Sequence, residues 1–137
     1  MLENQKVNIK IKLASLWASA TFCYLYGDYF ELYTPDKVSS LITGDNIMDN
    51  PTTLLIASII LAIPSVMVAA SIFLKPKINR ILNLLFGTLF TIMTVFIGII
   101  STNEWYIFYV FLAFLESIIT ALIVWYAWKW PKEKSEL

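Results

Sequence analysis

Long apolar runs separated by short polar segments make up most of the chain. Four of these runs reach the roughly 20 residues that a helix needs to cross the hydrocarbon core of a bilayer. They cover approximately residues 13–30, 53–74, 81–100 and 105–128. Short connections place consecutive helices antiparallel to one another. The pattern therefore predicts an all-α polytopic membrane protein, an up-down bundle of four transmembrane helices that forms a single domain over residues 1–137.

The connection at residues 34–51 is the only one long enough to hold structure of its own. Thr34 followed by Pro35 is typical of a helix N-terminus, and Gly44 is typical of a helix end. Apolar residues between these signals recur on one helical face. We therefore expect a short interfacial helix that lies on the outer leaflet.

Basic residues are distributed very unevenly among the polar segments. Nine of the ten fall before the first run, between the second and third, or after the fourth, and only Lys37 falls elsewhere. The positive-inside rule then places both termini and the connection between the second and third runs in the cytoplasm. The predicted location is the cell membrane, with the protein as a multi-pass component of the bilayer.

Composition narrows the classes of function. Hydrophobic residues make up 58% of the chain and charged residues 15%, and the mean hydropathy is +0.70, which excludes an ordinary soluble domain. Ten basic and ten acidic residues give no net charge, so nucleic acid is not an expected partner. Histidine is absent and Cys23 is the only cysteine, which removes imidazole metal sites, Ser-His triads and Cys-His dyads. We expect no metal and no cofactor, and a role other than catalysis is favoured.

Small and polar residues indicate which helix faces are buried, because membrane helices associate through close packing and interhelical hydrogen bonds. In the third run they recur at spacings of three and four: Asn83, Gly87, Thr91, Thr94, Gly98 and Ser101. The same rule selects Ala14, Ala18, Thr21, Leu25 and Asp28 in the first run, Ser58, Ala62, Ser65 and Ala69 in the second, and Tyr109, Ala113, Glu116, Ser117, Thr120, Val124 and Ala127 in the fourth.

Glu116 is the most unusual residue in the apolar runs. It lies 11 residues after Trp105, which at 1.5 Å per residue places it about 16 Å along the helix, near the bilayer midplane. No basic residue occurs at that depth, so we expect the carboxyl group to be largely neutral unless a cationic ligand or a water-filled cavity stabilises its charge. Two roles stay open: the central charge of a ligand site, or a hydrogen-bonded contact between helices through Thr91 or Thr94.

Asp28 lies in the outer third of the first run, among tyrosines. It is either an interfacial acid bonded to tyrosine hydroxyls or the outer mouth of a ligand site. Aromatic walls with an acid suit a small hydrophobic or cationic ligand. The candidate ligand-binding residues are Glu116, Asp28, Tyr24, Tyr109, Thr91, Thr94 and Thr120.

Five segments together resemble a family of small bacterial integral membrane proteins that is known only as a domain of unknown function with four predicted helices. They are LASLW, YLYGDYFELYTP, IPSVMVAAS, KPKINRILN with Gly87, and FLAFLESIITALIVWYAWKW. The resemblance covers nearly the whole chain, implies the four-helix architecture and a location in the bacterial inner membrane, and supplies no activity. Members often carry an acid immediately before the Ile-Pro of the second helix, where this chain has Ala62.

A fainter likeness, of topology only, is to sterol-isomerase-like and ligand-binding four-helix membrane proteins. Three functions stay open at this stage. The chain could bind or carry a small hydrophobic or cationic ligand, serve as a non-catalytic subunit of a membrane complex, or act as a membrane enzyme on a lipid-soluble substrate through acid–base chemistry. We expect the protein to be surrounded by the lipid bilayer, and a homo-oligomer is compatible with a chain of this size.

Overall fold

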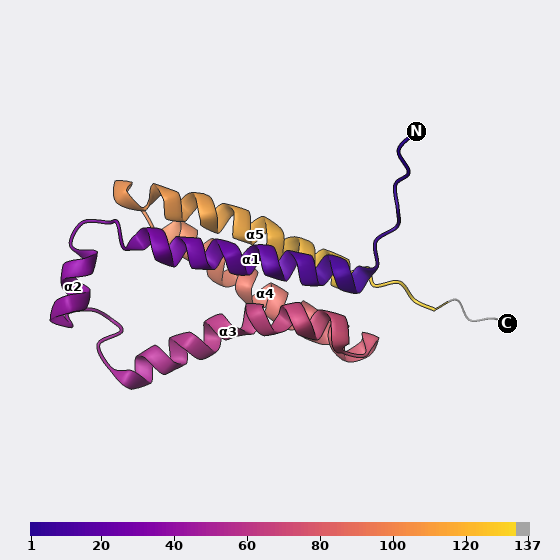
Figure 1. The fold of residues 1–137 in the computed structure, drawn as a ribbon, viewed down its shortest axis with the longest axis horizontal. Coiled ribbons are helices and arrows are strands. Elements are labelled where there is room, and N and C mark those ends of the chain that lie inside the picture. Colours follow the sequence, from indigo (N-terminus) through magenta and orange to yellow (C-terminus); the bar gives the residue numbers. More distant parts are fainter. Residues whose placement is uncertain (134–137) are drawn as a thin grey trace.

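The computed structural model describes residues 1–133, and in these residues the chain forms helices and no strands. The elements in chain order are α1 (Ile9–Glu31), α2 (Lys37–Thr43), α3 (Pro51–Phe73), α4 (Pro76–Ile100), the short 3₁₀ helix η1 (Glu104–Tyr106) and α5 (Ile107–Trp128). The long helices α1, α3, α4 and α5 alternate in direction (Figure 1), with the start of α1 and the end of α5 at one end of the molecule and α2 at the other. The all-α prediction is confirmed.

Three of the long helices are apolar enough to cross a membrane. They are α3, α4 and the continuous stretch of η1 and α5, with mean hydropathies of 2.4, 2.1 and 2.4. Helix α1 is as long as α3, at 23 residues, but it carries charged residues at both ends and does not reach the same apolar character. Three of the four predicted runs therefore form helices with the length and apolar character that a membrane span needs.

Helix ends follow local capping chemistry. Helix α1 begins before the predicted residue 13 because the Asn8 side chain accepts a hydrogen bond from the Lys10 backbone N–H at 2.8 Å. Helix α3 begins at Pro51, and Asn50 caps it by accepting from the backbone N–H of Thr53 at 2.9 Å. Helix α4 begins at Pro76, ahead of the predicted residue 81, because proline suits the first helical position.

The predicted start of the outer helix at Thr34 and Pro35 is wrong, because α2 begins at Lys37. The Thr34 hydroxyl instead donates to the carbonyl of Glu31 at 2.8 Å and so closes the end of α1. Lys37 also contacts this end, through an ion pair with Glu31 at 2.8 Å. Gly44 ends α2 with a φ of 76°, as predicted, since glycine adopts the left-handed conformation without strain.

The core lies in the half of the bundle nearer the chain termini. It consists of Leu13, Trp17, Met67, Phe90 and Ile123, each at most 2% exposed. The rings of Trp17 and Phe90 meet edge to face with their centres 6.0 Å apart. Side chains from all four long helices therefore contribute to one apolar cluster.

A buried polar network accompanies this core and was not predicted from the sequence. The indole N–H of Trp17 donates to Asn83 Oδ1 at 2.7 Å, and Asn83 Nδ2 donates to Asn79 Oδ1 at 2.7 Å. Asn79 Nδ2 in turn donates to the carbonyl of Ser71 at 2.6 Å. The network joins α1, α3 and α4, and all four residues are 0% exposed. Buried polar groups are stabilising only when they are satisfied in this way.

The predicted buried faces are confirmed for α4 and α5, where the selected residues are buried or half-buried. The face predicted for α1 is wrong in part, since Leu25 is 60% exposed while Trp17 is buried. The face predicted for α3 is wrong throughout, because Ser58, Ala62, Ser65 and Ala69 are all exposed.

Bending explains the error for Ser58 and Ala62, in the first half of α3, whereas Ser65 and Ala69 follow Pro64 and face away from the buried Met67 and Ser71. Pro64 lies inside this helix and cannot donate a hydrogen bond to the preceding turn, and Figure 1 shows that α3 bends in its middle and that its first half lies apart from the other long helices. The small residues of that half therefore pack against no neighbouring helix. Ser58 satisfies its own hydroxyl by donating to the carbonyl of Leu54 at 2.8 Å.

Helices α4 and α5 approach closely at Gly87, which gives a first prediction. A Cβ atom on Gly87 would lie 2.9 Å from Val124 Cγ2 and 3.2 Å from Ile123 Cγ2, whereas one on Gly98 would lie 3.4 Å from the nearest atom. We expect Gly87→Ala to lower the free energy of unfolding by about 1–3 kcal/mol through overpacking. Gly98→Ala is the matched control and is expected to leave it unchanged or slightly raised. Unfolding in detergent micelles measures both, and equal stabilities would contradict this packing.

Candidate functional site

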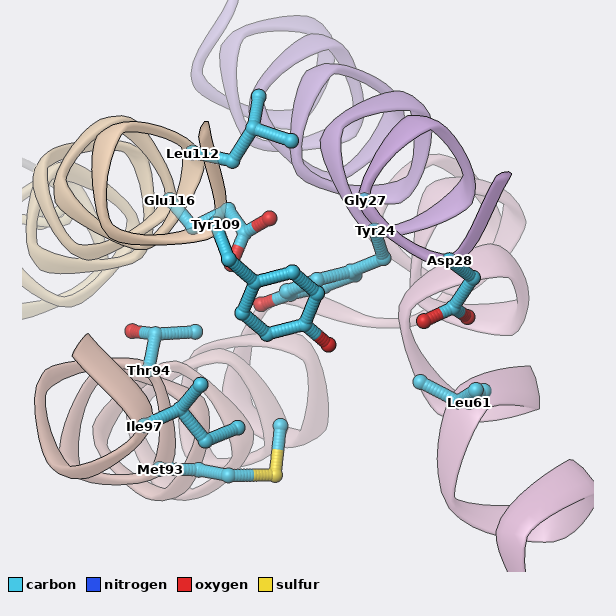
Figure 2. A pocket seen from close by; sticks show the side chains of 10 residues that line it. All are labelled: Tyr24, Gly27, Asp28, Leu61, Met93, Thr94, Ile97, Tyr109, Leu112 and Glu116. Atoms are coloured by element: carbon cyan, nitrogen blue, oxygen red, sulfur yellow. The ribbon is translucent and has the colours of Figure 1, made fainter. Parts of the chain in front are cut away.

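A cavity lies in the half of the bundle that is farther from the start of α1 and the end of α5, at the level where α3 has bent away (Figure 2). Its volume is about 60 Å³, which is room for a few water molecules or a group of a few heavy atoms. Helices α1, α3, α4 and α5 all contribute to its lining: Tyr24, Gly27, Asp28, Leu61, Met93, Thr94, Ile97, Tyr109, Leu112 and Glu116.

Helical periodicity explains why these side chains converge. Tyr24, Gly27 and Asp28 recur at spacings of three and four and share one face of α1, and Tyr109, Leu112 and Glu116 share one face of α5 in the same way. The two helices are in contact at Gly27, where a Cβ atom would lie at an ordinary van der Waals distance of 3.5 Å from Tyr109 Cε2. The chain thus builds one wall of the cavity from α1 and α5 together.

The two carboxyl groups at the cavity make no hydrogen bond and no ion pair with any described residue. Glu116 is 7% exposed, and only its backbone carbonyl is engaged, by the hydroxyl of Thr120 at 2.8 Å. Tyr24 adds a buried hydroxyl that also lacks a partner among residues 1–133. Because an unpartnered buried polar group is costly, the cavity is suited to a ligand or to water that supplies the missing contacts.

Aromatic rings occupy the space between the carboxyl groups. Figure 2 shows the rings of Tyr24 and Tyr109 between the side chains of Asp28 and Glu116, with Leu61 on the opposite side from α5. No lysine or arginine lines the cavity. Acidic groups beside aromatic faces, with no cation supplied by the protein, form surroundings that favour a positive charge.

The seven candidate residues separate into two groups. Glu116, Asp28, Tyr24, Tyr109 and Thr94 all line the cavity, as the sequence-based hypothesis requires. The remaining two do not.

Thr91 and Thr120 lie instead in the seam between α4 and α5, where the Thr91 hydroxyl donates to Thr120 Oγ1 at 2.8 Å. Thr94 and Ser117 form a second hydroxyl pair across this seam, at 3.0 Å. Beside the cavity, the hydrogen bonds between these helices are therefore made by hydroxyl groups, and the side chain of Glu116 is not among their partners.

The apolar wall of the cavity was not anticipated from the sequence. Leu112 could have been found, since it lies three residues after Tyr109 and four before Glu116 on the same helical face. Leu61, Met93 and Ile97 gave no such signal, because their place at the cavity depends on how α3 and α4 are oriented. Among the described residues, no group of histidine, cysteine and carboxylate side chains is arranged to hold a metal ion.

Comparison with known families assigns the chain to one of them. A family model described as a family of unknown function, DUF6326, matches residues 2–136. The chain belongs to this family. The resemblance drawn from the sequence motifs is confirmed, and membership in DUF6326 carries no statement of activity. No curated protein and no solved structure matches the chain significantly.

Proposed function

We propose that this membrane protein binds a small cation, or the cationic group of a larger apolar molecule, at Glu116. The observation that carries the proposal is the buried Glu116 side chain, which faces a small aromatic cavity and has no partner among the described residues. Asp28 adds a second acid to the lining, and the chain supplies no basic residue there. A bound cation provides the partner that the carboxyl group lacks.

Electrostatics favours a cation over a neutral ligand of the same shape. In apolar surroundings an ionised carboxylate is stable only when it is paired and hydrogen-bonded. A cation next to Glu116 forms such a pair, and the rings of Tyr24 and Tyr109 attract it further through their negative faces. The same ligand displaces the proton that keeps the carboxyl group neutral in the empty site, so a carrier built on this site exchanges a cation for a proton.

The cavity volume limits the size of the ligand that can bind at Glu116. A space of about 60 Å³ is far below the roughly 300–1,000 Å³ typical of sites for drug-sized molecules. The cavity therefore accommodates a compact ammonium group but not a large ring system. A larger ligand would place only its cationic end inside, with its apolar part toward the bent half of α3.

Tetramethylammonium is a suitable probe because it is compact and carries a permanent charge. We expect it to raise the Tm of the purified protein in detergent, by a stabilisation that reaches about 2.7 kcal/mol at 100 times Kd. The neutral alcohol tert-butanol has nearly the same shape and is expected to leave Tm unchanged. Equal shifts with the two compounds would mean that shape alone is recognised and would overturn the proposal of a cation site.

The proposed arrangement in the membrane has α1 as a fourth span and both termini in the cytoplasm of a bacterial cell. Helix α1 is long enough to cross the bilayer, and it packs along both α3 and α5. Nine of the ten basic residues fall on the proposed cytoplasmic side. The alternation of the four helices in Figure 1 is compatible with this topology.

Single-cysteine labelling tests the topology. In a Cys23→Ala background, we expect an impermeant maleimide added to intact cells to label Ser39→Cys, in α2, and not Asn4→Cys or Lys77→Cys. Permeabilisation is expected to expose both protected positions. Equal labelling of Asn4→Cys and Ser39→Cys in intact cells would mean that α1 does not cross the bilayer.

A further inference from the structure

Two basic hollows lie side by side at the end of the bundle that carries both termini. The larger, of about 620 Å³, is lined by Lys6, Lys12 and Lys129 together with the aromatic side chains of Trp125, Tyr126 and Trp130. The smaller, of about 310 Å³, is lined by Lys77, Arg80 and Lys132. Trp130 and Pro131 line both hollows, and no acidic residue lines either one.

The lysines of the larger hollow are positioned by aromatic rings. Lys12 Nζ lies 5.2 Å from the ring centre of Tyr126, and Lys129 Nζ lies 4.6 Å from that of Trp125. A cation over an aromatic face keeps its N–H groups free for an anionic acceptor, while the contact restricts the lysine stem. Neither ammonium forms an ion pair with a carboxylate of the described residues.

Two other basic residues at this end of the bundle, Lys10 and Arg80, donate hydrogen bonds to backbone carbonyls at helix ends. Lys10 donates to the carbonyl of Leu74 at 2.8 Å and so satisfies the end of α3. Arg80 donates through Nε to the carbonyl of Ala127 at 3.1 Å and through Nη2 to that of Trp128 at 3.3 Å, which satisfies the end of α5. Helix ends account for these two residues, whereas the ammonium groups of Lys12, Lys77, Lys129 and Lys132 make no hydrogen bond or ion pair with a described residue.

We propose that the two hollows bind the phosphate groups of anionic phospholipids, with Lys12 and Lys129 holding one phosphate and Lys77 and Lys132 the other. Trp125 and Trp128 are 48% and 68% exposed, and amphipathic rings of this kind lie at the level of the lipid headgroups. Basic pockets between helices at the basic side of a membrane protein are suited to such headgroups. This inference concerns the opposite end of the bundle from the cavity and does not depend on the proposed function.

Trp130 and Pro131 line both hollows, so the two hollows are adjacent. This adjacency favours a lipid that carries two phosphates. One such molecule can reach both hollows around the indole ring, whereas a lipid with one phosphate occupies one hollow at a time. Binding the second phosphate is then intramolecular and strengthens the complex without new protein contacts. We therefore expect the affinity to rise from phosphatidylcholine through phosphatidylglycerol to cardiolipin.

Lipid titration followed by native mass spectrometry tests the proposal on the purified full chain. Phosphatidylglycerol is expected to bind at least tenfold more tightly than phosphatidylcholine, and cardiolipin more tightly again. The double variant Lys12→Gln with Lys129→Gln is expected to weaken phosphatidylglycerol binding about tenfold and to reduce the advantage of cardiolipin. Lys37→Gln, at the other end of the molecule, is the matched control and is expected to bind both lipids as the wild type does.

Three results would overturn the proposal. Equal affinities of the wild type for phosphatidylcholine and phosphatidylglycerol would do so without any variant. Unchanged lipid binding by the double variant, once its folding is verified, would place the lipid elsewhere. Binding of soluble glycerol 3-phosphate as tight as that of phosphatidylglycerol would identify a site for free phosphate esters and not for a lipid.

Discussion

Replacing Asn83 with leucine is expected to lower the free energy of unfolding by about 2–4 kcal/mol, the largest single loss in this fold. The change removes the acceptor of the Trp17 indole N–H and the donor to Asn79 Oδ1, at 2.7 Å each. Both partners are 0% exposed, so bulk solvent does not reach them to replace the lost bond. The Ser71 hydroxyl, also 0% exposed, loses its contacts with Asn83 at 3.4 Å as well. An orphaned buried polar group costs roughly 1–3 kcal/mol, and up to three are created.

Thr91→Val is the matched control for Asn83→Leu, because it also removes an interhelical hydrogen bond at nearly constant volume. Thr120 still donates to the carbonyl of Glu116 after this change, so no buried donor is left without a partner. The expected loss is about 0.6 kcal/mol, typical of such bonds in membrane proteins. Unfolding of the three proteins in micelles gives the comparison. If Asn83→Leu were no less stable than Thr91→Val, the network would not hold α1, α3 and α4 together.

Replacing Glu116 with glutamine is expected to leave the free energy of unfolding unchanged or to raise it by about 1–2 kcal/mol in the absence of cations. The side chain keeps its shape, and the variant loses a buried acid that has no partner among the described residues. A functional group that is costly to bury is often retained because the ligand needs it. This behaviour is the opposite of that expected for Asn83, although both are buried polar residues.

The stability of Glu116→Gln also separates the two roles that the sequence left open. A loss of more than about 1 kcal/mol would mean that the carboxyl group holds helices together and would favour a structural subunit. Glu104→Gln is the control, because Glu104 is an exposed acid of η1 outside the cavity. It is expected to unfold as the wild type does.

Local signals and periodicity account for what the sequence predicts well. Gly44 is a short-range signal, and it marks the end of α2 as expected. The buried faces of α4 and α5 follow from small residues because these two helices pack closely along their length, with Gly87 at the tightest point. Glu116 stands out for a similar reason, since an acid in the middle of an apolar run is unusual in any context.

Features that depend on contacts distant in sequence could not be predicted. Trp17 and Asn83 are separated by 66 residues, and nothing in the pattern around either one indicates the other. The face of the first half of α3 was misassigned because the rule for small residues assumes a neighbouring helix, which the bent half lacks. Thr91 and Thr94 both belong to the buried side of α4, yet only Thr94 reaches the cavity. Residues three apart on a helix differ in direction by about 60°, which is enough to separate a seam from a cavity wall.

The most direct test of the account is the Kd of tetramethylammonium for the wild type, Glu116→Gln and Glu104→Gln, measured by isothermal titration calorimetry in the same detergent. We predict that Glu116→Gln weakens binding at least tenfold, because the ligand loses its charged partner, while Glu104→Gln binds as the wild type does. Equal affinities of the wild type and Glu116→Gln would contradict the assignment of Glu116 as the group that binds the cation.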